Sequence, residues 1–247
     1  MRADWIADRP IAHRGFHDAA RGVLENTASA FSAAVAGGFA MECDVQITAD
    51  GEAMVFHDDT LDRLMEGSGR LDSFTRAELQ TLPMRQGRDR MITLGELCDL
   101  VAGRAPVIVE IKAAWSADRR LEARVAQILG GYKGPVAVMS FDPGSMRAMR
   151  ALAPSLPRGV TQESVYDDPE WDRLTAWQKF SLGRLLHLPQ SRPDFLAWYV
   201  KDLHYRAPRF ARAVLGLPML TWTVRTAADQ ARAALYADQM IFEGFTP

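Results

Sequence analysis

The chain has 247 residues, of which 48% are hydrophobic and 24% charged, a composition typical of an ordinary globular protein. A net charge of −2 and a pI near 6.2 exclude a general attraction to nucleic acid or to an anionic membrane, so any recognition of phosphate must be local. Two cysteines, Cys43 and Cys98, form neither a disulfide framework nor a metal-ligand spacing.

The amino-terminal residues lack the apolar stretch of a secretory signal, and no run in the chain approaches the length of a membrane span. We therefore expect a cytoplasmic protein that has no nucleic-acid partner and no stable membrane anchoring.

Apolar, β-rich runs recur along the chain, and helical patterns separate most of them. Apolar stripes at i, i+3, i+4 and i+7 spacing predict helices that include Phe31, Ala34, Val35 and Gly38, and then Leu121, Val125, Ile128 and Leu129. The predicted strands are residues 10–13, 39–45, 106–111, 135–141, 158–161, 195–200, 218–224 and 239–242. Eight strands alternating with helices favour an α/β fold of the (β/α)8 TIM barrel type, with a doubly wound open sheet as the alternative.

Two long stretches interrupt this alternation. Residues 58–92 are rich in Asp, Arg and Gly and include a short predicted helix at 75–82, so we expect an insertion after the second strand of a single domain spanning 1–247. Residues 164–194 form another long connection, which contains Lys179, Arg184 and His187 among apolar side chains. That run could touch a lipid surface, but a helix that covers the barrel is the favoured interpretation.

Ionisable residues occur at strand-like spacing in four short segments. Alternate residues of a strand share a face, so Glu42 and Asp44 project together, as do Glu110 and Lys112, while Cys43 and Ile111 point the opposite way. Such charged groups beside apolar runs need partners, and we expect them to converge on one cavity. The segments are His13-Arg14-Gly15, Glu42-Cys43-Asp44, His57-Asp58 and Glu110-Ile111-Lys112.

The sequence Ala49-Asp50-Gly51-Glu52 is typical of a two-residue hairpin turn with Asp50 and Gly51 at its centre. Residue numbers paired across such a hairpin sum to 101, so Asp44 is predicted to lie opposite His57, with Cβ atoms about 4.5 to 5.5 Å apart.

Glu42, Asp44 and Glu110 offer hard oxygen ligands, which favour one divalent cation, Mg²⁺ or Ca²⁺. A zinc site that uses His13 and His57 is the less favoured alternative, because three carboxylates suffice when water and a substrate phosphate complete the coordination. Taken alone, Glu42 and Asp44 would be interpreted as the solvated end of a strand. Glu110 lies inside an apolar run, where a charged side chain needs a partner, and this argues against that interpretation.

His13 and His57 fit a general acid and base pair, because imidazoles exchange protons near neutral pH. Arg14 can bind a phosphate through two parallel hydrogen bonds, and Lys112 can neutralise charge that develops during phosphoryl transfer. Ion pairs with neighbouring carboxylates are an alternative for both cations, and the two roles are compatible.

Other candidate residues carry weaker signals. Glu25 could orient Arg14, contact substrate or simply begin a helix. Trp222 could form the floor of a polyol pocket or pack within the barrel. Helix-capping residues are predicted among Asn26, Thr27 and Ser29.

Taken together, these motifs resemble the glycerophosphodiester phosphodiesterase family, and the ordered set covers nearly the whole chain. The chain departs from the family pattern at Leu24, where a proline is usual, at 64–66 and at 242–245, where a Thr-Asp pair is usual. The matching motifs are His13-Arg14-Gly15, Glu25-Asn26-Thr27, Glu42-x-Asp44-Val45, Thr48-x-Asp50-Gly51, His57-Asp58, Thr93-Leu94-x-Glu96, Glu110-Ile111-Lys112 and Thr221-Trp222-Thr223-Val224.

The resemblance implies a metal-dependent phosphodiesterase that hydrolyses small-molecule glycerophosphodiesters to glycerol 3-phosphate and an alcohol. It implies that His13 and His57 are catalytic, that Glu42, Asp44 and Glu110 bind the metal, and that Arg14, Lys112, Glu25 and Trp222 bind substrate. One alternative is an enzyme of the lysophospholipase D or phospholipase C type that acts on lipid phosphodiesters, with residues 164–194 receiving the acyl chain. An alternative of another class is a non-catalytic module that binds a phosphate ligand.

Overall fold

The computed structural model describes residues 4–112 and 115–247. Its strands follow the order β1-β9-β8-β7-β6-β5-β4-β2-β3, and pairing of β1 with β2 closes eight parallel strands into a barrel. β3 (Ala53–Val55) pairs antiparallel with β2 outside the closed ring. The barrel strands are β1 (Ile11–Ala12), β2 (Ala40–Ile47), β4 (Val107–Ile111), β5 (Val136–Ser140), β6 (Arg158–Gln162), β7 (Phe195–Tyr199), β8 (Met219–Val224) and β9 (Gln239–Phe242).

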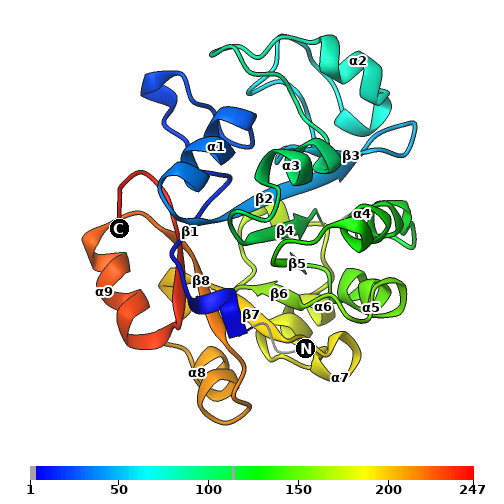
Figure 1. Ribbon diagram of the computed structural model, residues 1–247. Helices are drawn as coiled ribbons and strands as arrows, with labels where there is room; N and C mark the ends of the chain where they lie inside the picture. Colours follow the sequence, from blue (N-terminus) through cyan, green and yellow to red (C-terminus); the bar gives the residue numbers. More distant parts are fainter. Residues whose placement is uncertain (1–3, 113–114) are drawn as a thin grey trace.

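Helices connect successive strands and surround the barrel (Figure 1). The closed ring confirms the predicted (β/α)8 barrel and excludes the open doubly wound sheet. The helices are α1 (Ala28–Ala36), α2 (Arg76–Thr81), α3 (Leu94–Val101), α4 (Arg120–Gly131), α5 (Pro143–Leu152), α6 (Ala176–Gly183), α7 (Leu188–Ser191), α8 (Arg206–Ala213) and α9 (Ala227–Tyr236). Short 3-10 turns occupy Asp4–Ala7, Ala19–Arg21, Leu71–Ser73, Pro169–Trp171 and Val200–Asp202.

The two predicted apolar stripes lie on α1 and α4, with one correction. Phe31 and Ala34 are buried on α1, but the helix ends at Ala36, and Gly38 follows it with a φ of 73°. Gly38 therefore belongs to the turn that leads into β2, where glycine readily adopts a positive φ.

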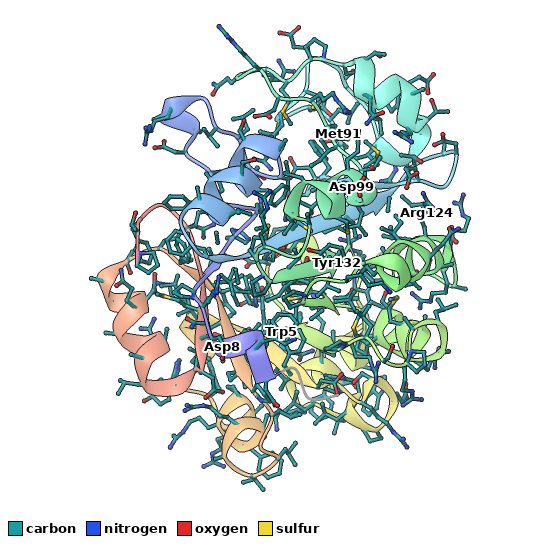
Figure 2. The ribbon with its side chains drawn as sticks, in the orientation of Figure 1. Trp5, Asp8, Met91, Asp99, Arg124 and Tyr132 are labelled. Atoms are coloured by element: carbon teal, nitrogen blue, oxygen red, sulfur yellow. The ribbon has the colours of Figure 1, made fainter. Side chains whose placement is uncertain are left out.

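The barrel strands separate two apolar layers. Cys43 and Ile111 pack outward against the helices, as predicted from their spacing. A smaller cluster inside the barrel includes Ile11, Ile108 and Ile241, and Trp5 of the amino-terminal turn packs against it (Figure 2). The inner face is therefore apolar toward the amino ends of the strands, which leaves polar side chains at the carboxyl ends.

The segment 58–92 leaves β3, carries α2 and returns to α3 (Figure 1). Thr75 caps α2 by accepting a hydrogen bond from the Glu78 amide while the Glu78 side chain accepts from Thr75, so the predicted helix is present. Leu61, Leu71 and Leu79 form part of a separate apolar cluster beneath this segment. No helix in the described part of the chain is long and apolar enough to cross a membrane.

Candidate active site

A cavity of about 280 Å³ opens among the carboxyl ends of the strands and the segments that follow them. All but one of the predicted site residues line it. The lining residues are His13, Arg14, Glu42, Asp44, His57, Asp59, Glu110, Lys112, Trp115, Met139, Phe141, Glu170, Trp171, Arg173, Trp222, Thr223, Arg225 and Ile241.

Three buried carboxylates meet inside this cavity. Asp44 of β2 lies directly beside Glu110 of β4 in the parallel register, and Glu42 precedes Asp44 by two residues on the same face. One carboxylate oxygen from each of the three lies within 4.8 Å of the others. The strand spacing in the sequence therefore predicted this cluster correctly.

The charges around the cluster affect its members differently. Burial, together with the neighbouring charge of Asp44, raises the pKa of Glu42 well above its usual value. Burial also raises the pKa of Glu110, against the opposing charge of Lys112. For Asp44 burial acts in the same direction, but the charges of His57, Lys112 and Arg14 outweigh it and hold its pKa well below the usual range. Negative charge is therefore concentrated at Asp44 and remains unfavourable at the two glutamates.

This donor set fits a hard divalent cation. Oxygen ligands from three carboxylates, all on rigid strands and all within reach of one point, match the preferences of Mg²⁺ and Ca²⁺. A bound dication would also offset the like-charge repulsion that raises the pKa of Glu42.

Two cations border the acidic cluster. Lys112 Nζ lies 3.2 Å from Glu110 Oε1 and 3.5 Å from Asp44 Oδ1. Arg14 Nε lies 3.3 Å from Asp44 Oδ2, and the Arg14 amide donates to Glu42 Oε2 over 2.8 Å. Both cations thus pair with carboxylates, which is the alternative foreseen for them, and both also line the cavity.

A tight turn carries His13 and Arg14 over the end of β2. Arg14 has a φ of 53° and Gly15 a φ of 79°. A Cβ atom at Gly15 would lie 2.9 Å from the Ala30 backbone, so only glycine fits here without displacing α1. The Gly15 amide donates to the Glu42 carbonyl oxygen, and this bond fixes the turn above the acidic cluster.

A carboxylate holds the Nδ1 atom of each catalytic candidate. His13 Nδ1 lies 2.7 Å from Glu243 Oε2, and His57 Nδ1 lies 2.8 Å from Asp58 Oδ1. An Nδ1–H that donates to a carboxylate leaves Nε2 as the basic nitrogen of the ring. Burial lowers the pKa of His13 to about 4, although the bond to Glu243 partly opposes this shift. Glu243 had no role predicted from the sequence.

His57 reaches the cavity by a route that differs from the predicted hairpin. Val45 pairs with Val55 and Ile47 with Ala53, so paired numbers sum to 100 and Asp44 lies opposite Phe56. The tip of the turn has three residues, which are Ala49, Asp50 and Gly51. The Gly51 amide donates to the Thr48 carbonyl oxygen, and Gly51 has a φ of 84°. The third tip residue shifts the register by one.

The prediction that Asp44 lies opposite His57 is therefore wrong, although both side chains line the cavity. The chain leaves the strand ladder after Phe56. Gln46 Nε2 then donates to the carbonyl oxygens of His57 and Asp58, and these bonds hold the turn that presents the imidazole to the cavity.

Glu25 does not line the cavity. Its carboxylate accepts from Arg14 Nη1 over 2.7 Å and from both terminal nitrogens of Arg63. Arg63 also donates to both carboxylate oxygens of Asp58, the partner of His57. Among the alternatives weighed for Glu25, the structure favours orientation of Arg14, and Arg63 is a further network residue that the sequence did not single out.

Asn26 has a role that capping signals could not reveal. Thr27 is the residue that caps α1, because its side chain accepts from the Ala30 amide. Asn26 is buried, with a φ of 57°, and its Nδ2 donates to Asp44 Oδ2 over 3.0 Å. The side chain therefore fixes one oxygen of Asp44 and leaves the other oxygen near Lys112.

Aromatic side chains also line the cavity. Trp222 of β8 donates from Nε1 to the Ala197 carbonyl oxygen and packs edge-on against Phe141, with ring centroids 5.4 Å apart. Phe141 in turn contacts Trp171, which comes from the long segment 164–194. Trp171 and Trp115 extend the aromatic wall beyond the single Trp222 that the sequence predicted.

The closed barrel, with an acidic cluster and two imidazoles at its carboxyl end, has the form of a (β/α)8 barrel hydrolase. A sequence model described as "Glycerophosphoryl diester phosphodiesterase family" matches residues 13–242. The chain therefore belongs to the glycerophosphoryl diester phosphodiesterase family, a family of phosphoric diester hydrolases, as the motifs predicted.

Relatives span most of the chain. A Bacillus subtilis (strain 168) relative is 31% identical over 235 residues, which cover 90% of this chain and 88% of the relative. A glycerophosphodiester phosphodiesterase of Caldanaerobacter subterraneus subsp. tengcongensis is 30% identical over 182 residues, or 70% of this chain and 73% of its own.

A similar solved structure is an Oleispira antarctica phosphodiesterase in complex with the product sn-glycerol-3-phosphate. Its TM-score is 0.77 at 20% identity, with 96% of this chain and 94% of that chain covered, and this likeness shows the shared fold.

Proposed function

We propose that this protein hydrolyses glycerophosphodiesters to glycerol 3-phosphate and an alcohol, with one divalent cation at the acidic cluster. The observation that carries the proposal is the convergence of Glu42, Asp44 and Glu110 with two carboxylate-held imidazoles in one cavity. A non-catalytic binding module would not need two imidazoles whose Nδ1 atoms are both fixed.

Glu42, Asp44 and Glu110 would hold the cation, Mg²⁺ or Ca²⁺, which would supply electrostatic stabilisation to a phosphodiester bound beside it. Arg14 would bind phosphate oxygens with guanidinium hydrogens that Glu25 and Asp44 leave free. Lys112 would neutralise charge that develops on the phosphoryl oxygens. Trp222 would pack against the glycerol carbons on the aromatic wall.

His13 and His57 would move the two protons of the reaction. One imidazole takes a proton from the attacking water or hydroxyl group as the oxygen of that group bonds to phosphorus. The other imidazole gives a proton to the oxygen of the departing alcohol as the bond between that oxygen and phosphorus breaks. Glu243 and Asp58 would stabilise each imidazole in its protonated state. The attacking oxygen belongs either to water or to the glycerol 2-hydroxyl. In the second route a cyclic phosphate forms first and water then opens the ring to give glycerol 3-phosphate, so a trapped cyclic phosphate would distinguish the two routes.

We further propose that residues 1–247 form a single domain in which 58–92 is an insertion. This is supported by the ion pair that Arg63 of the insertion makes with Glu25, which lies between β1 and α1.

The test measures sn-glycerol 3-phosphate release from glycerophosphocholine and glycerophosphoethanolamine. Activity should disappear with a chelator, return with Mg²⁺ or Ca²⁺, and fall about 10²-fold or more in His13→Ala and in His57→Ala. The exposed His204 lies outside the cavity lining, so His204→Ala is a matched control that should keep full activity. Release that is indifferent to both the chelator and the two histidine variants would refute the proposal.

A further inference from the structure

An exposed aromatic pair lies on α6. Trp177 keeps 68% of its surface exposed and Phe180 keeps 49%, and their rings stack with centroids 5.7 Å apart. Val165 and Leu186, from the same long segment, are also exposed apolar side chains. Large aromatic side chains are usually buried, so a stacked pair in solvent marks a surface that contacts something apolar.

The other side of α6 rests on the wall of the catalytic cavity. Leu182 is buried in a cluster with Trp171, against which Trp115 and Phe141 pack, and these three aromatic residues line the cavity. Trp115 also lines a second cavity of about 350 Å³, and Trp177 lies along that one. The exposed pair and the catalytic cavity are thus connected through one packed unit.

The helix that carries the pair is basic. Residues 173–193 contain four cations and no acidic residue, whereas the exposed acidic residues of the same long segment, Asp167, Asp168, Glu170 and Asp172, precede them. Arg184 lies over the Phe180 ring at 5.4 Å from its centroid, and Lys179 is on the same helix. Neither Lys179 nor Arg184 forms an ion pair with any residue in 4–112 or 115–247. Aromatic residues bordered by unpaired cations are typical of helices that lie in a membrane interface with anionic lipids.

We propose that the Trp177 face, formed by Trp177, Phe180, Lys179 and Arg184, docks the protein on an anionic lipid surface. This inference rests on the proposed function and extends its substrate class to monoacyl glycerophosphodiesters, which reside at such surfaces. Trp177 and Phe180 enter the interface while the two cations contact lipid phosphates. The packed unit of α6 and Trp171 then holds the cavity beside the lipid headgroups.

The test is co-sedimentation with unilamellar phosphatidylcholine vesicles that contain about 30 mol% phosphatidylglycerol or none. The wild type should bind the vesicles that contain phosphatidylglycerol more tightly than the vesicles that contain none. The double variant W177A/F180A should lower the partition coefficient about tenfold or more, and K179Q/R184Q should lower it about fivefold for each cation. Leu235→Ala on α9 and Arg209→Gln on α8 are exposed, remote controls that should bind as the wild type does.

Activity measurements separate this inference from the proposed function. W177A/F180A should hydrolyse water-soluble glycerophosphocholine at the wild-type rate but lose lysophosphatidylcholine hydrolysis in anionic vesicles. Wild-type vesicle binding without any hydrolysis would support the docking surface and refute the enzymatic proposal.

Two results would overturn the docking surface while leaving the enzymatic proposal intact. One is unchanged vesicle binding in W177A/F180A. The other is a shift of W177A/F180A from dimer to monomer in sedimentation velocity with no change in vesicle binding, which would show that a second copy of the chain covers this face.

Discussion

Replacing Glu42 with Gln tests the acidic cluster through stability, independently of catalysis. The side chain supplies one of three carboxylate oxygens that lie within 4.8 Å of one another. Loss of one anionic ligand should weaken cation binding by about 100-fold or more, because even outer-sphere changes commonly cost about 10- to 100-fold. The Gln carbonyl oxygen can still accept from the Arg14 amide, so the local fold should persist.

The expected magnitude follows from binding linkage. At a cation concentration of about 100 times the wild-type Kd, binding stabilises the wild type by about 2.7 kcal/mol and the variant by only about 0.4 kcal/mol. For a chain of this length each kcal/mol shifts Tm by about 2 to 4 °C, so the cation should raise Tm by roughly 5 to 11 °C in the wild type and by about 1 °C in Glu42→Gln.

Thermal unfolding with EDTA, and then with Mg²⁺ or Ca²⁺, measures this difference. Glu163→Gln is the matched control, because Glu163 is another buried carboxyl group that lies outside the acidic cluster. Its Tm should respond to the cation as the wild-type Tm does. Equal cation responses in the wild type and Glu42→Gln, or no response in either, would refute a cation site at these carboxylates.

Three further predictions concern single side chains. His13→Ala and His57→Ala should each lower kcat by about 10²- to 10⁴-fold but leave the cation-induced rise in Tm unchanged. Paired kinetic and melting experiments on these variants would thus separate proton transfer from metal binding. Asn26→Ala should destabilise the fold by about 1 to 3 kcal/mol in urea unfolding, because Asp44 loses a buried hydrogen bond; an unchanged unfolding midpoint would contradict this. Burial raises the pKa of Glu163 to about 8, so the folded protein keeps a proton that the unfolded chain loses near pH 4.5. The free energy of unfolding should therefore fall as the pH rises from about 4.5 to about 8, by up to about 1.4 kcal/mol per pH unit. This pH dependence should be weaker in Glu163→Gln.

The sequence was sufficient where periodicity and chemistry act over short distances. The eight predicted strands coincide with the barrel strands to within a few residues, because predominantly apolar, β-rich runs separated by helical patterns are typical of buried parallel strands. The Glu42, Asp44 and Glu110 cluster followed from alternation within strands and from parallel pairing of β2 with β4.

The hairpin register needed information that the Asp50-Gly51 pair does not carry. The same two residues suit a two-residue turn or the last two positions of a three-residue turn, and the backbone of Thr48 to Glu52 selects the longer form. One residue of difference moved Phe56, rather than His57, opposite Asp44.

Long-range partners were also invisible in the sequence. Glu243 is 230 residues from His13, and only closure of the barrel brings their side chains together. Asn26 looked like a helix cap because such signals are local, whereas its contact with Asp44 depends on how β2 passes the end of α1. A carboxylate after the last strand, in a chain with an orphan histidine after the first, is the signal that could have revealed Glu243.

The ion-pair chain from Asp58 through Arg63 and Glu25 to Arg14 constrains how this barrel can be re-engineered. A chimera that imports residues 58–92 from a relative without a cation at the position of Arg63 would leave Glu25 to pair with Arg14 alone. Grafting of that segment should therefore preserve the ion-pair chain only when the loop between β1 and α1 is exchanged with it. The two segments thus form one unit for recombination, although they are separate in the sequence.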